Sequence, residues 1–282
     1  RRVASAGEVV EALKQPAARP SAAGVERSVA VLYFENMSAD TESEYFCAGM
    51  TEDIITDLSK IKHLKVASRS DVLPFRNKEI NIRQAGESLN VSHILEGSIR
   101  KAGNKIRITA QLIDVASGFH VWAERFDRLI EDIFEIQSEV SQKIAEALKI
   151  SLTDSERESI AHKPTEDLRA YDFYMRGRDL LSRRGKKNAE TAIQMFENAI
   201  RIDPNFTASY AGLAEAASYM YAWYDGDARW LGKMIEMSQK TLGLDPTSVD
   251  AMFSMGTMYF HQKRFTEARR YWEKAIQSQP DY

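Results

Sequence analysis

One phrase that ends a helix occurs three times in the last third of this chain, and it constrains the fold more than any other feature. Its copies are Ala199-Ile-Arg-Ile-Asp-Pro204, Thr241-Leu-Gly-Leu-Asp-Pro246 and Ala275-Ile-Gln-Ser-Gln-Pro280, with prolines 42 and then 34 residues apart. Such a period indicates stacked units, each a pair of antiparallel helices that buries its apolar face against its neighbours. Residues 169–282 are therefore predicted to form an all-α solenoid of about three units.

Small residues recur where the two helices of a unit must cross. In the last unit Gly256 and Ala268 occupy these positions, and Tyr259 and Trp272 fill the space beside them. Larger side chains at the crossings would force the helices apart. The middle unit is eight residues longer than the last (42 against 34 between prolines), and we expect the excess at residues 221–229, as a longer loop or as extended helices.

Residues before the solenoid follow a different pattern, in which strands and helices alternate. Residues 28–34 form one apolar run, as expected of a strand covered on both faces. The stripe of Met50, Ile54 and Leu58 predicts a helix whose acidic residues, Glu52 among them, fall mostly on the other face. This pattern predicts an α/β unit with a mixed sheet of about five strands and packed helices. Its further strands are expected at 64–67, 94–101, 105–115 and 120–127, and its further helices at 82–89 and 133–147.

These patterns divide the chain into four segments. Residues 1–27 combine a short helix with a stretch rich in Pro and Ala, and we interpret that stretch as a linker. The α/β domain is expected to span 28–150. Residues 151–168 are expected to be a linker helix that begins at a capping box, and the repeats follow at 169–282.

Bulk composition excludes several classes of partner. Lys and Arg number 38 against 41 Asp and Glu, so the chain lacks the basic field that nucleic-acid binding requires. No run approaches the roughly 18 consecutive apolar residues that span a bilayer, so we expect no membrane partner within this segment. Cys47 is the single cysteine, which excludes an internal disulfide and favours a reducing, cytoplasmic location.

The sequence lacks complete signatures of catalysis and of metal binding. Gly86-Glu-Ser-Leu-Asn90 is one glycine short of a nucleophile elbow, and its serine falls inside an expected helix. The five histidines show no close pairing with metal-ligand spacing, so satisfied or exposed histidines are the simpler reading. We therefore expect no enzyme activity in this segment, no catalytic, cofactor-binding or metal-binding residues, and no cofactor.

Longer phrases of the chain resemble two known families. Residues 169–282 resemble tetratricopeptide repeats, and the last copy matches their pattern of small and large residues best. Residues 28–150 resemble the TolB-like amino-terminal domain of bacterial regulators. The phrases that carry this second resemblance are Ser28-Val-Ala-Val-Leu-Tyr-Phe-Glu-Asn-Met-Ser38, Glu44-Tyr-Phe-Cys-Ala-Gly-Met-Thr-Glu-Asp-Ile-Ile-Thr-Asp-Leu58, Leu95-Glu-Gly-Ser-Ile-Arg100, Ile106-Arg-Ile-Thr-Ala-Gln-Leu-Ile-Asp114 and Val121-Trp-Ala-Glu-Arg-Phe-Asp127.

The resemblance implies a position within a larger signalling protein. In that family the domain usually lies between an output domain and carboxy-terminal repeats, and the output is a protein kinase, a class III nucleotidyl cyclase or a winged-helix DNA-binding domain. Residues 1–13 resemble the final helix of a bacterial Ser/Thr kinase domain. A kinase is therefore the expected output, with its catalytic residues upstream of this chain and a cyclase as the second expectation.

Two functions are compatible with this organisation. In the first, the repeats bind a peptide or a protein partner on the concave surface formed by the first helix of each unit. In the alternative, the α/β domain is a small-ligand sensor that controls the attached kinase or cyclase, with its pocket at the strand ends. Self-association is also expected, because the apolar side around Tyr271 and Trp272 has no further helix to cover it. The candidate partner-binding residues are Tyr171, Tyr174, Arg178, Glu215, Asp250, Phe253, Thr257 and His261.

Overall fold

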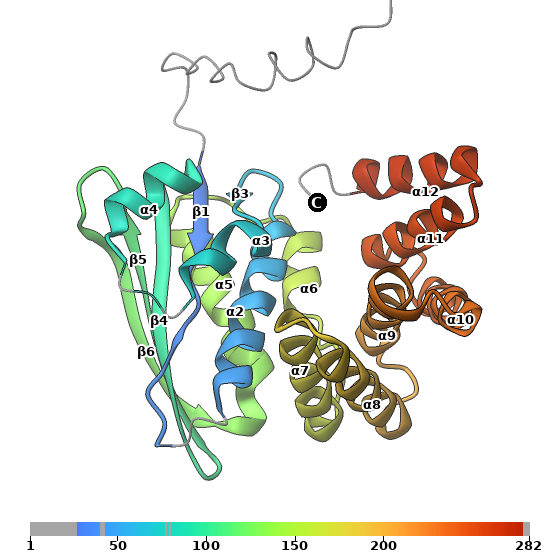
Figure 1. Cartoon of the computed structure of the whole chain (residues 1–282). Coiled ribbons are helices and arrows are strands. Elements are labelled where there is room, and N and C mark those ends of the chain that lie inside the picture. Colours follow the sequence, from blue (N-terminus) through green and yellow to red (C-terminus); the bar gives the residue numbers. More distant parts are fainter. Residues whose placement is uncertain (1–26, 40–42, 77, 79, 279–282) are drawn as a thin grey trace, which may run out of the picture.

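The computed structural model describes residues 27–39, 43–76, 78 and 80–278. It contains an α/β domain and, packed beside it, a curved stack of helices (Figure 1). The kinase-like helix expected at residues 1–13 lies outside the described residues, and so does Pro280.

The sheet of the α/β domain is mixed, as predicted, and has six strands in the described residues. Its order is β3-β1-β4-β5-β6, and the two-residue β2 pairs with β4. Strand β1 runs parallel to β3 and β4, whereas β4, β5 and β6 form an antiparallel meander. All five expected strands are present, and the sixth is too short for a sequence pattern to indicate. The strands are β1 (Ser28–Val31), β2 (Glu35–Asn36), β3 (Lys65–Val66), β4 (His93–Ala102), β5 (Lys105–Asp114) and β6 (His120–Leu129).

Two long helices, α2 and α5, pack on one face of this sheet (Figure 1). Their apolar stripes bury Met50, Ile54 and Val140 completely against strand residues such as Val29 and Ile108. The short α3, which begins with a cap from Ser68, was not expected from the sequence. The helices of this domain are α2 (Glu44–Ser59), α3 (Arg69–Val72), α4 (Ile82–Leu89), α5 (Ile133–Ala147) and α6 (Asp154–Ala161), with 3-10 turns η2 (Leu73–Phe75) and η3 (Ile130–Asp132).

Helix α2 is buried on more than one face. Glu52 is 4% exposed and Thr51 is fully buried. The reason is tertiary, because the first helix of the repeats also packs against α2. Ile55, also buried, lies outside the predicted apolar stripe and could have indicated this second contact.

The segment expected as a linker helix packs onto the α/β domain. Thr153 and Glu156 form the predicted capping box at the start of α6. The Glu156 carboxylate also accepts a hydrogen bond of 3.0 Å from the backbone N–H of Lys62, and Ile160 is buried in the core of the α/β domain. Residues 154–161 therefore hold the end of α2 rather than spanning free space.

The remaining residues form three helical pairs, as the repeated phrase predicted. Adjacent helices of the stack pack against each other in chain order. A π-helical turn, η4 (Tyr221–Asp225), extends α9 beyond its usual end and accounts for the excess length expected at 221–229. The pairs are α7 (Leu168–Ser182) with α8 (Lys186–Ile202), α9 (Thr207–Met220) with α10 (Ala228–Leu244), and α11 (Val249–His261) with α12 (Phe265–Ser278).

The crossings of these pairs depend on glycine, as predicted. A Cβ placed on Gly256 would lie 2.4 Å from the Trp272 ring, so only glycine lets α11 and α12 approach this closely. Phe196 of α8 is fully buried between two glycines, since a Cβ on Gly177 or on Gly212 would lie 2.7 Å from its ring. One aromatic side chain thus joins the first three helices of the stack.

Candidate functional site

A cluster of charged side chains joins the α/β domain to the first repeat. Arg178 of α7 donates a hydrogen bond of 2.8 Å to Asp53 of α2 and forms an ion pair with Glu52. Arg69 of α3 donates to the same Glu52 over 2.7 Å. These four residues, the interdomain ion cluster, are mostly buried, with side-chain exposures of 18%, 19%, 4% and 34% for Arg178, Asp53, Glu52 and Arg69. Buried ionic groups that satisfy one another define one relative position of the two parts.

Neutral polar groups complete the bonding of the cluster. The hydroxyl of Tyr171 donates to Asp53, and the amide of Gln137 in α5 donates to both, at 3.1 Å to the Asp53 carboxylate and 2.7 Å to the Tyr171 oxygen. Nearer the end of α7, Arg76 pairs with Asp179 at 3.0 Å. Helices α2 and α5 are therefore hydrogen-bonded to α7.

The pKa shifts within the cluster indicate that it has a structural role. Burial raises the pKa of Asp53, and the Arg178 guanidinium opposes this shift. Burial also raises the pKa of the Tyr171 hydroxyl well above its ordinary value, and raises that of Tyr33, which donates to Glu52 over 3.1 Å, to about 12. Both tyrosines therefore stay protonated near neutral pH as hydrogen-bond donors.

Asp57, one turn further along α2, makes stability depend on pH. Burial raises its pKa to about 6, although Lys60 at 2.7 Å opposes the shift. Because the folded pKa lies above the unfolded one, the stabilising contribution of the protonated group is complete below about pH 4 and is lost as pH rises through 6. We expect this one group to lower the free energy of unfolding by about 2 kcal/mol between pH 4 and pH 7.

Replacing Asp57→Asn should remove that part of the pH dependence, as measured by urea unfolding at pH 4, 5.5 and 7. Glu146→Gln is the matched control, because Glu146 is 74% exposed on α5. Parallel pH curves for the wild type and Asp57→Asn would contradict the assignment.

Three of the predicted partner-binding residues lie at the interdomain contact or inside the repeats rather than on an open surface. Tyr171 is 2% exposed against Phe134 and Asp53, and Arg178 is occupied by the ion cluster. Tyr174 packs between Phe196 and Phe206, with ring centroids 6.0 and 4.9 Å away. This corrects the expectation that the first helix of every repeat is free: the α/β domain covers α7.

The other five predicted residues lie on α9 and α11, beyond that contact. Glu215 and Asp250 are exposed, and partial loss of hydration raises the pKa of Glu215, which the nearby Arg69 opposes. Thr257 is half-buried and donates its hydroxyl to the Phe253 carbonyl over 3.1 Å. His261 is half-buried, and its ring meets that of Tyr221 edge-on at 5.0 Å, whereas Phe253 is 47% exposed. Within the described residues, the part of the concave surface that the α/β domain leaves uncovered therefore begins at α9.

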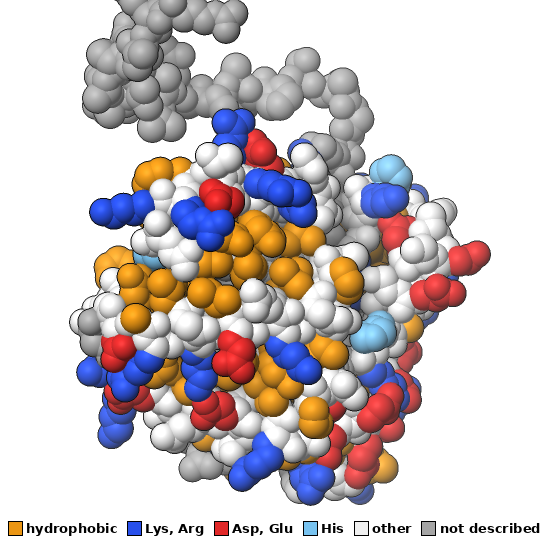
Figure 2. All heavy atoms as spheres, turned by 90° about the vertical axis from the view of Figure 1, so that its right-hand side faces the viewer, with side chains coloured by type: hydrophobic (Ala, Val, Ile, Leu, Met, Phe, Trp, Pro, Cys, Tyr) orange, Lys and Arg blue, Asp and Glu red, His pale blue; other side chains and the backbone are white. Residues whose placement is uncertain are grey.

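Four aromatic residues of the last helical pair form a surface of their own. Phe253, Phe260 and Phe265 are 47%, 49% and 60% exposed, and Trp272 lies between them. Ring centroids are 6.3 Å apart for Phe253 and Trp272, 5.8 Å for Phe260 and Trp272, and 5.7 Å for Phe260 and Phe265. We call these four the aromatic patch. Figure 2 shows hydrophobic side chains gathered on the side of the molecule that faces away from the α/β domain, with charged side chains of both signs around them.

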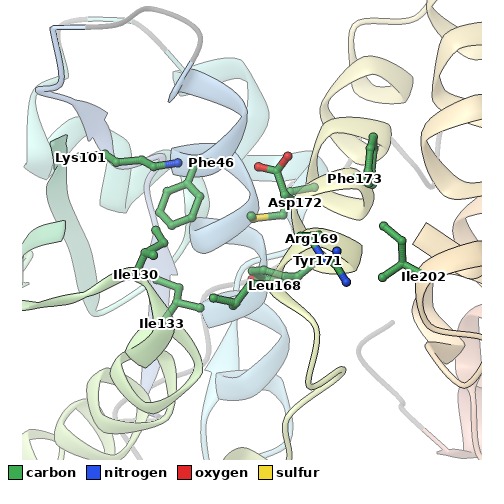
Figure 3. A pocket seen from close by; sticks show the side chains of 11 residues that line it. Phe46, Lys101, Ile130, Ile133, Leu168, Arg169, Tyr171, Asp172, Phe173 and Ile202 are labelled. Carbon is green, nitrogen blue, oxygen red and sulfur yellow. The ribbon is translucent and has the colours of Figure 1, made fainter. Parts of the chain in front are cut away.

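Two cavities lie near the start of α2. The larger, of about 500 Å³, is mostly apolar, is open to solvent on one side and is lined by residues of α2, β4, η3, α5, α7 and α8 (Figure 3). The smaller, of about 290 Å³, follows the end of β1 and is lined by polar groups that include Tyr33, Glu44 and Arg76. Cys47 also borders it, and burial raises the pKa of this thiol to about 12, so the thiolate that would react is scarce near neutral pH.

Metal and membrane signatures are not found within residues 27–39, 43–76, 78 and 80–278. No group of three or more His, Cys, Asp and Glu side chains there is placed to hold a metal ion. No helix in the same residues is long and apolar enough to cross a membrane.

Comparison with known families supports the two-part organisation. Residues 25–147 match the HilA/YgeH-like transcriptional regulator, second domain, and residues 249–282 match the tetratricopeptide repeat. The chain therefore combines an α/β domain similar to a domain of transcriptional regulators with helical pairs of which the last matches the tetratricopeptide repeat.

One curated relative extends across both parts. It is the "Putative adenylate cyclase 3" of Rhizobium meliloti (strain 1021), 37% identical over 243 residues. The match covers 86% of this chain but only 41% of the relative, so this chain corresponds to less than half of that protein.

Solved structures resemble single parts of the chain only distantly. TolB from Acinetobacter baumannii is 21% identical, with a TM-score of 0.34, and the match covers 43% of this chain and 28% of TolB. MamA is 19% identical, with a TM-score of 0.33, over 53% of this chain and 78% of MamA. These scores are too low to support a structural argument, and the fold rests on the geometry described above.

Proposed function

We propose that this chain is a non-catalytic regulatory and protein-interaction segment of a bacterial signalling protein, whose repeats bind a peptide or protein partner. The observation that carries the proposal is the aromatic patch, because four large rings contact one another while three of them stay about half exposed. Exposed clusters of this kind mark interaction sites, and aromatic anchors dominate binding energies. Tetratricopeptide repeats, of which residues 249–282 are one, recognise peptides and helices.

The partner that fits this surface is an apolar helix face or peptide. The best-placed contacts are Phe253, Phe260 and Phe265, of which only Phe253 was expected from the sequence. Thr257 and His261 lie on the same helix as Phe253 and Phe260.

Selection from a displayed random-peptide library against the 282-residue chain tests this proposal. Selected peptides should lose about 30-fold or more in affinity for the double variant Phe253→Ala, Phe260→Ala, because one aromatic anchor at an interface contributes about 2 kcal/mol. Phe119→Ala is the matched control, since Phe119 is 75% exposed on the α/β domain. Failure to select peptides, or equal affinity for both variants, would count against the repeats as the binding surface.

The attached output is part of the proposal. The name of the 37% identical relative favours a nucleotidyl cyclase, whereas the short resemblance of residues 1–13 favours a Ser/Thr kinase. We infer that the parent protein carries one of these two outputs, that it acts in the cytoplasm, and that this segment relays a binding event to it. Detection of cyclase or kinase activity in the full-length parent, with and without a selected peptide, distinguishes the two.

The alternative function, a small-ligand sensor, has one specific observation in its favour. The polar cavity at the end of β1 lies where α/β sheets usually bind ligands. Its Arg76 is already paired with Asp179, so this cation is not available to a ligand. The partner-binding function is therefore the better supported of the two.

A further inference from the structure

The larger cavity has the composition of a binding site for a small amphiphile. It lies at the junction of the α/β domain with the first repeat, between the first turn of α2 and the start of α7 (Figure 3). Its volume of about 500 Å³ falls within the range of small-molecule sites, which are lined mainly by apolar side chains and a few polar groups. Its apolar walls are Phe46, Ile130, Ile133, Leu168, Met175 and Ile202.

Two of its three charged side chains already have partners. Arg169 forms a bidentate pair with Asp167, at 2.7 and 3.1 Å. Asp172 accepts from Arg176 over 2.8 Å and also from the hydroxyl of Tyr45. These groups are satisfied within the protein.

Lys101, at the end of β4, is the third charged side chain of the cavity and differs from the other two. Its ammonium lies 5.6 Å from the centre of the Phe46 ring, at the wall of the cavity (Figure 3). Among the ion pairs of the described residues, none includes Lys101, although it is half-buried. A partly desolvated cation beside an apolar cavity favours a ligand that carries a negatively charged group.

We propose that this cavity binds a soluble amphiphile with one unbranched apolar chain and one carboxylate, the carboxylate pairing with Lys101 and the chain lying between α2, α5 and α7. The proposal does not depend on the partner-binding function of the repeats, because the aromatic patch lies on α11 and α12. A ligand here contacts both parts of the molecule, so it stabilises their docked arrangement by mass action.

Decanoate is a suitable probe, titrated into the 282-residue chain by calorimetry. Decanol and decylamine carry the same chain with no charge and with a positive charge. Decanoate should bind at least about tenfold more tightly than either, because one charge-assisted hydrogen bond contributes more than a factor of ten. Saturating decanoate should also raise the melting temperature.

Variants at Lys101 and Leu168 test whether these residues form the binding site. Lys101→Met keeps the stem that covers Phe46 and should weaken decanoate about tenfold while leaving decanol unchanged. Lys105→Met, on the neighbouring strand and outside the cavity, is its control. Leu168→Trp should fill the cavity and weaken both ligands. A folded wild type that binds none of the three probes, or decanoate binding that both lysine variants leave equal, overturns the proposal.

Discussion

Replacing Arg178→Met should destabilise the protein by about 3–5 kcal/mol, because it removes one partner from a buried ionic network. The change leaves Asp53 with hydrogen bonds only from Tyr171 and Gln137. It leaves Glu52 with Arg69 as its one cationic partner, beside the hydrogen bond from Tyr33. Uncompensated charge in a buried contact costs far more than an exposed ion pair contributes. Urea unfolding near pH 7, followed by circular dichroism, measures the loss.

Arg169→Met is the matched control on the same helix, since the Arg169 side chain is 78% exposed and pairs with Asp167 at the surface. Its effect should be within about 1 kcal/mol. The two variants differ only in whether the ion pair is buried between the two parts. Equal losses for both would show that α7 is not held to α2 through the interdomain ion cluster.

Replacing Phe196→Ala should cost about 3–5 kcal/mol, through lost burial and the cavity that remains between α7, α8 and α9. The ring is fully buried, and the glycines on its two sides offer no side chain that could move into the space. The Tyr174 ring, whose centroid lies 6.0 Å from that of Phe196, also packs against Phe206. It cannot move into the cavity without losing its contact with Phe206. We therefore expect the surrounding side chains to fill the cavity only in part and the loss of stability to be large.

Phe265→Ala serves as the control, because Phe265 is 60% exposed and its truncation should change stability by about 0.5 kcal/mol or less. Both variants are compared by the midpoint of thermal or urea unfolding. A loss below 1 kcal/mol for Phe196→Ala would mean that the first three helices are not packed around this ring.

Together these results would test whether binding at the repeats is felt by the α/β domain. A buried ion cluster connects α2 to α7, and a shared aromatic ring connects α7 to α9. A force or displacement at the repeats would then act on the α/β domain through packed side chains.

Local features of the fold could be predicted from the sequence. The strands of the meander, α4, the capping box at Thr153 and the three helical pairs all follow from residues close together in the chain. The same holds for the close approach of Gly256 to Trp272 and for the extra turn at Tyr221–Asp225. Periodicity, caps and the period of a repeat are local properties, so one sequence is enough to read them.

The candidate site could be predicted only in part, because its decisive contacts join distant residues. Phe253 was expected to be exposed on a first helix, and it is; Phe260 and Phe265 were not singled out, although they stand close to it along the chain. The burial of Glu52 on α2 was not expected from the sequence, and only Ile55, three residues further on, indicated a second contact.

The sequence by itself determined which elements form and how each helical pair closes, since those depend on neighbours within a few turns. Only the tertiary structure decided that α7 is covered, that Tyr171 and Arg178 bind Asp53 rather than a partner, and that a cavity lies at Lys101. Asp53 and Arg178 are 125 residues apart, and no local pattern encodes which of many charged side chains will meet across such a distance.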